Sequence, residues 1–216
     1  MSLAPITPPV RRFAGKRVLL FMLAIVILAA IPAVVVPILG RHRAPALKDI
    51  GVIPPFALTD ETGQPFTEAA LSGHPTIVSF IFTRCDTICP ITSMKMEMIQ
   101  KKTFGDAVKL LSISVDPTYD TPPRLAEYAK RYAADPTRWH FITGPADKIH
   151  QLVEGPFMTS MMREADRPGG VPNIAHGGYF MLVDGHLHLR GMYSSSDVHE
   201  LDKLVRDALY LARTGT

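Results

Sequence analysis

The chain has 216 residues, of which 47% are hydrophobic and 20% charged, a composition that excludes a disordered or low-complexity protein and leaves room for one domain plus an appendage. Its formal net charge of +3 is unevenly distributed, because residues 1–43 contain six Lys and Arg and no acidic residue. The remaining 17 Lys and Arg stand against all 20 Asp and Glu, so residues 44–216 carry a net charge of −3 and no nucleic-acid partner is expected.

An uncharged apolar run extends over residues 18–39. As a helix, its 22 residues would span roughly the 30 Å hydrocarbon core of a bilayer. We therefore predict a transmembrane anchor at 18–39, a cytoplasmic segment at 1–17 and a tether at 40–49. A secretory signal peptide is the competing interpretation, because the stretch before Pro32 has a suitable length and a basic flank. Lys and Arg are slightly more numerous before the run than after it, which favours a domain that faces outward.

The folded domain is predicted at residues 50–213, and its first elements are two short strands around a polar turn, at 56–60 and 61–66. The run TIVSFIF at 76–82 is apolar, rich in β-branched residues and bounded by Gly and Pro. This pattern is typical of a strand that is buried on both faces.

A helix is expected from Pro90 onward, with Ile91, Met94 and Met98 at helical spacing on its core face. The elements expected after it are a strand at 108–115, a helix that Asp120 and Thr121 cap, a strand at 139–142, a helix at 146–153, a hairpin of 179–183 and 187–192, and a helix at 197–213. Strands alternating with helices before a terminal hairpin and helix predict an α/β, thioredoxin-like fold with a mixed sheet and an N-terminal β-hairpin extension. The segment 155–178 is expected to be a long functional loop.

Cys85 and Cys89, the only cysteines of the chain, lie at the junction of the predicted strand and helix. The N-terminus of a helix offers N–H groups and a positive potential that lower the pKa of a thiol. Thiolates at such a position suit metal binding or disulfide exchange, whereas a structural disulfide closing so short a loop would add little stability.

Three segments carry a family resemblance: FIFTRCDTICP at 80–90, SVDPTYDTP at 114–122 and HGGYFMLVD at 176–184. In this order they resemble motifs of the Sco/SenC family of copper chaperones, over roughly residues 50–210. The resemblance implies that Cys85, Cys89 and His176 bind one copper ion. Two thiolates and one imidazole can hold Cu(I) or Cu(II).

The same resemblance implies a role and a set of partners. The protein would be a metallochaperone that receives copper from a donor protein and delivers it to the dinuclear copper site of cytochrome c oxidase subunit II. Its domain would face the bacterial periplasm or the mitochondrial intermembrane space.

An enzyme remains the alternative interpretation. A thiol-disulfide oxidoreductase would use Cys85 to attack a partner's disulfide and Cys89 to resolve the mixed disulfide. His176 distinguishes the two functions, because copper binding needs it and simple exchange does not. A peroxidase is a weaker third option, since reactive thiols reduce peroxides but no further motif supports one.

Each of three acidic residues predicted near the cysteines has more than one possible role. Asp86 stands where the family commonly has proline, and its charge is expected to raise the thiol pKa or to add a hydrogen bond near the site. Asp116 and Asp120 either order the cysteine loop or serve as turn and cap residues.

Methionines and histidines are further candidates for metal binding. Met94 and Met98 are expected in the helix core rather than as thioether ligands. The remaining candidates are Met158, Met161 and Met162, as copper ligands or a partner surface, His186 and His188, as a weak metal site on one strand face, and His199, as a solvated side chain.

Overall fold

The computed structural model describes residues 19–23, 25–26, 28, 47–157, 162–167, 171–175 and 178–215. The chain divides into two compact units, Met1–Ala44 and Pro45–Thr216. The described residues of the first unit are helical, apolar and exposed. The predicted anchor at 18–39 lies largely outside the described residues, and within the described part no helix has both the length and the apolar character needed to cross a bilayer.

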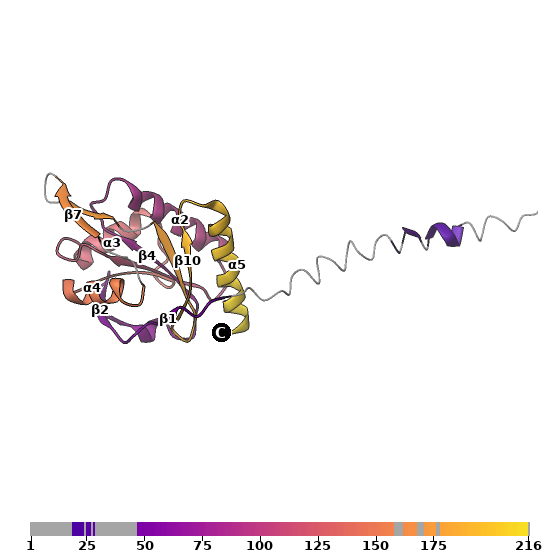
Figure 1. The fold of residues 1–216 in the computed structure, drawn as a ribbon, viewed down its shortest axis with the longest axis horizontal. Coiled ribbons are helices and arrows are strands. Elements are labelled where there is room, and N and C mark those ends of the chain that lie inside the picture. The colour runs from indigo at the N-terminus through magenta and orange to yellow at the C-terminus, as the bar shows by residue number, and fades with distance from the viewer. Residues whose placement is uncertain are drawn as a thin grey trace, which may run out of the picture. The chain divides into compact units, whose positions relative to one another are not determined.

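An eight-stranded mixed sheet with the strand order β1-β10-β9-β4-β5-β6-β2-β3 forms the centre of the second unit (Figure 1). Its strands are β1 Gly51–Val52, β2 Ala57–Asp60, β3 Pro65–Thr67, β4 Thr76–Ile81, β5 Lys109–Ser114, β6 Trp139–Thr143, β9 Tyr179–Val183 and β10 His188–Ser194. The strands β4, β5 and β6 are parallel, while β9 and β2 run antiparallel to their neighbours β4 and β6. The predicted mixed sheet and N-terminal hairpin are confirmed; the two-residue strand β1 was not predicted.

Three helices share one face of this sheet. The helices of the domain are α2 Ile88–Lys102, α3 Pro122–Arg131, α4 Ala146–Glu154 and α5 Val198–Thr214, with a short 3-10 helix η1 at Glu68–Ala70. Helix α2 contacts α3 through a 2.9 Å hydrogen bond between the hydroxyls of Ser93 and Tyr128. It contacts α5 through a 2.8 Å ion pair between Lys102 and Asp202. Helix α2 is therefore the central helix of its layer.

A buried polar row crosses the middle of the sheet beneath these helices. The hydroxyls of Ser79 and Ser112 lie 3.0 Å apart, and the indole N–H of Trp139 donates to Ser112 at 3.0 Å. Phe80, the next residue along β4, points to the opposite face, where it packs edge-on against Phe157 after α4. Helix α4 thus covers the second face.

The orientation of α2 differs from the prediction. The three residues expected in the core are about half exposed: Ile91 49%, Met94 53% and Met98 55%. The buried side carries instead Cys89, Thr92, Ser93, Met96, Ile99 and Gln100. Several of these polar side chains have fixed partners, since Gln100 donates to the carbonyl of Ala133 at 3.1 Å and accepts from the N–H of Asp135 at 2.8 Å. Satisfied hydrogen bonds make this polar side compatible with burial.

The segment predicted as a loop at 155–178 contains a second, two-stranded antiparallel sheet, β7 Met162–Arg167 and β8 Val171–Ala175. Among the described residues these strands pair only with each other. Strands outside the main sheet do not need the long apolar runs that reveal buried strands in a sequence, so the pattern of the segment did not reveal them.

Candidate metal and thiol centre

The structure brings the two cysteines together at the end of β4. Cys85 lies in the loop before α2 and Cys89 in the first turn of α2; both are thiols, with 8% and 0% of their surfaces exposed. The backbone N–H of Cys89 donates to Cys85 Sγ at 3.4 Å, and the hydroxyl of Thr87 lies 3.6 Å from the same sulfur. The N-terminus of α2 is therefore directed at Cys85.

The two thiols have opposite pKa shifts. The thiol of Cys89, assisted by backbone N–H groups and Thr87, hydrogen-bonds to Cys85 and lowers the pKa of Cys85 to about 4, although burial acts in the other direction. Pairing with Cys85 and burial raise the pKa of Cys89. Asp86 was expected to raise the pKa of the first thiol, but the net shift is downward because the hydrogen bonds outweigh the opposing effects. Cys85 is thus a thiolate at neutral pH, and the protonated thiol of Cys89 donates a hydrogen bond to it.

A pH titration of the reduced, metal-free chain should show this asymmetry. We expect the ultraviolet thiolate absorbance to rise in one step near pH 4, while the raised pKa of Cys89 keeps the second thiol protonated well above the range of an ordinary cysteine. A cysteine in the unfolded chain has a pKa of about 8.5. Because the pKa of Cys85 is lower in the folded chain, its thiolate stabilises the fold above that pH, and this contribution is lost as the pH falls toward 4. Cys89→Ala should move the Cys85 step upward. A single step near about pH 8.5 in the wild type would contradict the pairing.

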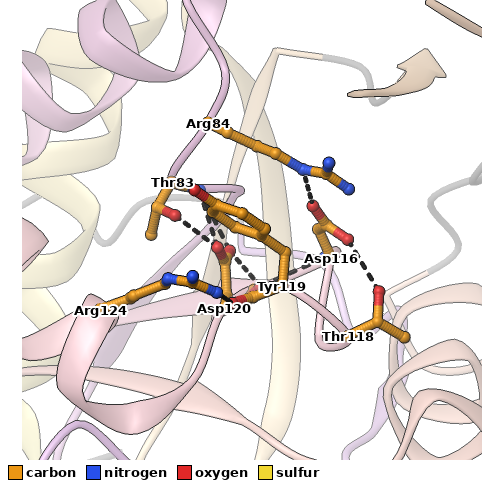
Figure 2. A network of polar contacts seen from close by, with 8 residues as sticks. Thr83, Arg84, Asp116, Thr118, Tyr119, Asp120 and Arg124 are labelled. Carbon is orange, nitrogen blue, oxygen red and sulfur yellow. Dashed lines mark hydrogen bonds and ion pairs between the residues drawn. The ribbon is translucent and has the colours of Figure 1, made fainter. Parts of the chain in front are cut away.

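The buried carboxylate of Asp120 holds the segment that precedes Cys85. It accepts hydrogen bonds from the backbone N–H of Thr83 at 3.1 Å, from the Thr83 hydroxyl, and from the Ser114 hydroxyl at 2.6 Å (Figure 2). Burial raises the pKa of Asp120, against the effect of these hydrogen bonds. Thr121 occupies the N-cap position of α3 but makes no side-chain cap hydrogen bond, so the predicted cap is wrong. Of the two roles left open for Asp120, these contacts support the one in which it orders the cysteine loop.

Asp116 makes the second link to this loop. Its buried carboxylate accepts from Arg84 Nε at 2.6 Å and from the Thr118 hydroxyl at 3.2 Å. The ring of Tyr119 lies between the side chains of Arg84 and Arg124, whose Cζ atoms are 4.6 and 4.0 Å from the ring centroid (Figure 2). The β5–α3 turn therefore contacts both residues directly before Cys85.

The predicted third ligand, His176, lies outside the described residues, as do Met158 and Met161. Met162 is the first residue of β7. Over the described ranges, no three His, Cys, Asp or Glu side chains are arranged to hold a metal ion. The described site thus supplies two sulfur donors, which suit a soft metal such as Cu(I), and His176 stays a prediction.

The histidines near the second hairpin do not form the expected pair. His186 lies in the turn before β10, where its backbone N–H donates to Asp184 at 2.9 Å. Only His188 belongs to β10, and its Nδ1 lies 3.0 Å from the carboxylate of Asp49. The prediction that both share a strand face is wrong, because the strand begins after His186.

Comparisons with known proteins match the folded domain to one protein family. The model of the SCO1/SenC family matches residues 45–208. The SCO1 protein homolog of Bacillus subtilis is 28% identical over 157 residues, which cover 72% of this chain and 80% of that protein.

Two solved structures share the fold over most of their length. Arabidopsis thaliana ScoI with copper bound has a TM-score of 0.64 and 25% identity, covering 76% of this chain and 99% of that one. BsSco, described as a member of the Sco family of cytochrome c oxidase assembly proteins with a disulfide switch, has a TM-score of 0.63 and 27% identity, covering 75% of this chain and 96% of that one.

Proposed function

Because this chain belongs to the SCO1/SenC family, we propose that it is a copper metallochaperone of cytochrome c oxidase assembly. One copper ion is held by Cys85, Cys89 and His176. The observation that carries the proposal is the buried thiol pair at the N-terminus of α2, in which Cys85 has a pKa of about 4 and is ionised without an external base. Copper bound to a solved relative supports the choice of metal.

Delivery follows from the arrangement of the two sulfurs. Copper leaves this chain by ligand exchange: an acceptor thiolate replaces Cys85, the more exposed sulfur, and further acceptor ligands then displace Cys89 and His176. Cys89 takes up one proton as it leaves the metal, whereas Cys85 remains a thiolate because of its low pKa, and any further proton that the acceptor thiols release passes to solvent. The acceptor is oxidase subunit II, whose dinuclear copper site must be reduced before loading, and the copper comes from a donor protein.

The remaining proposals concern location. Residues 18–39 anchor the chain in a membrane, and the domain faces the bacterial periplasm or the mitochondrial intermembrane space. The apolar run of 22 uncharged residues and the basic segment before it support this arrangement.

The opposite pKa shifts of the two cysteines favour thiol-disulfide exchange as a second candidate function. The Cys85 thiolate attacks a partner's disulfide, forms a mixed disulfide and releases one partner thiolate. Cys89 then loses its proton, displaces the second partner sulfur and leaves this chain oxidised. The two electrons gained by the partner come from the Cys85–Cys89 dithiol.

Copper titration of the full chain, reduced and without oxygen, tests the first candidate. We expect tight binding of one copper per chain with a thiolate-to-copper absorption band in the Cu(II) form, and a marked loss of affinity in His176→Ala. His199→Ala, which changes an exposed histidine of α5, should bind as the wild type does. Copper binding that is weak in the wild type, or independent of His176, would leave thiol-disulfide exchange as the better account.

A further inference from the structure

The solvent-facing side of α2 carries a continuous apolar stripe. Its four residues are Ile88, Ile91, Met94 and Met98, with 37%, 49%, 53% and 55% of their surfaces exposed. Spacings of three and four residues place all of them on one side of the helix. We call this set the α2 stripe. Of the nine large hydrophobic residues exposed in 47–157 and 178–215, four belong to the stripe, so exposure is concentrated on this helix.

Among the residues that the structure describes, no helix or strand covers the α2 stripe. Helix α2 packs on β4 with its inner side, on α3 through Ser93 and on α5 through Lys102. The side of α2 that faces away from these three contacts is its most apolar side. A contiguous apolar surface beside a reactive group is the usual sign of an interaction site in a soluble domain.

The chain before β9 and the chain before α5 both lie beside α2. A Cβ atom at Gly178 would lie 3.0 Å from the Ile88 side chain, and the ammonium group of Lys95 donates to the carbonyl of Ser195, three residues before the exposed Val198 of α5. Tyr179 does not extend the stripe, because by strand register it lies level with Phe80 and points to the opposite face of the sheet.

The α2 stripe begins at the cysteines and has the extent of an ordinary interface. Only 8% of Cys85 is exposed, and Cys89 is fully buried, so an acceptor sulfur reaches the site only if the acceptor's surface lies on the cysteine loop. A standard interface covers about 800 Å² on each partner, roughly a 16 Å radius. Met98 lies about 15 Å along the helix from Ile88. An acceptor seated over Cys85 is therefore wide enough to extend along the stripe.

An exposed cation lies beside the turn that contacts the cysteine loop. Arg124 is exposed and donates through Nη1 to the carbonyl of Tyr119 at 2.6 Å, while the charge of Arg84 is compensated by Asp116. An acceptor that carries a carboxylate opposite Arg124 would find complementary charge there.

We propose that the α2 stripe, together with the guanidinium group of Arg124, forms the docking surface for the protein that accepts the copper. This acceptor has cysteine ligands beside an apolar patch and a carboxylate placed to meet Arg124. The inference rests on the proposed metallochaperone function and adds the surface by which the acceptor is recognised.

Calorimetric titration of the copper-loaded full chain with the reduced, metal-free copper domain of oxidase subunit II tests this. Ile91→Glu/Met94→Glu should weaken the complex at least about tenfold, because two charges would enter the centre of an apolar contact. Met94→Leu/Met98→Leu, which keeps the apolar area but removes both sulfurs, should bind far better than the glutamate variant. Val52→Glu is the matched control and should bind like the wild type. Val52 is 56% exposed and, by strand register, lies level with the start of β4, at the opposite end of the sheet from Cys85.

Several results would overturn the proposal. If Ile91→Glu/Met94→Glu binds the acceptor normally, or if wild type does not bind it, the docking surface is wrong. If Met94→Leu/Met98→Leu loses affinity as severely as the glutamate variant, the sulfurs rather than the apolar area make the contact. If the wild type forms a dimer that the glutamate variant abolishes, a second copy covers the stripe. A copper titration of each variant alone shows separately whether metal binding, and with it the proposed function, survives.

Discussion

Replacing Cys85 or Cys89 with serine is expected to lower the affinity for copper by more than about 100-fold, since changes outside the ligand set already cost 10–100-fold and a ligand itself should cost more. Serine keeps the size of the side chain but offers a neutral hydroxyl in place of a soft thiolate. Competition with a chromophoric Cu(I) chelator, without oxygen, measures the effect.

Met96→Leu provides the matched control for the cysteine variants. Met96 is a fully buried sulfur on the same helix, and its exchange for leucine conserves volume. We expect its copper affinity to equal that of the wild type. If Cys85→Ser retained the wild-type affinity for copper, the assignment of the thiol pair as copper ligands would be wrong.

Asp120→Ala is expected to destabilise the domain by about 3 kcal/mol, because it removes the acceptor of three hydrogen bonds from Thr83 and Ser114, each contributing roughly 1 kcal/mol. The loop before Cys85 would lose its fixed position, so the copper affinity should fall by about 10–100-fold. Chemical denaturation of the metal-free chain gives the first quantity, and chelator competition gives the second.

Asp120→Asn separates the hydrogen bonds from the charge. The amide keeps an acceptor oxygen and removes a charge that burial disfavours, so it should lose only about 1 kcal/mol. Asp202→Ala, which breaks an exposed ion pair with Lys102, should leave the free energy of unfolding close to that of the wild type. If Asp120→Ala were as mild as Asp202→Ala, Asp120 would not hold the loop.

Much of the fold was predictable because its signals are local. The apolar run at 76–82, the cysteines and the following helix are contiguous in the sequence, so the junction that carries the site could be read from neighbouring residues. The alternation of strands and helices likewise identified the mixed sheet. The strand-to-helix position of the thiols also gave the correct direction of the Cys85 pKa shift.

The contacts that order the cysteine loop depend on register between distant segments. Thr83 and Asp120 are 37 residues apart and meet because β4 and β5 are parallel with Ile81 opposite Ser114. The carboxyl ends of adjacent parallel strands lie at one sheet edge, which could have suggested that Thr83 and Arg84 face the 116–120 turn. The stacking of Tyr119 between two arginines had no signal in the pattern.

Helix α2 was misjudged because apolar periodicity does not say which side is buried. The inner side is set by Cys89 and by polar groups whose partners lie on other elements, and these partners are invisible in the sequence.

The packing of α2 has a mechanical consequence for the two sulfurs. Cys89 belongs to a helix that is confined by the sheet and by two neighbouring helices, so its backbone is held in place. Backbone movement that changes the sulfur-to-sulfur distance, when a metal enters or a disulfide closes, would therefore fall on the short segment from Thr83 to Thr87. The resting position of that segment is set by two carboxylates of the β5–α3 turn. A protein that presses on Tyr119 or Arg124 would therefore displace Cys85 while leaving Cys89 in place.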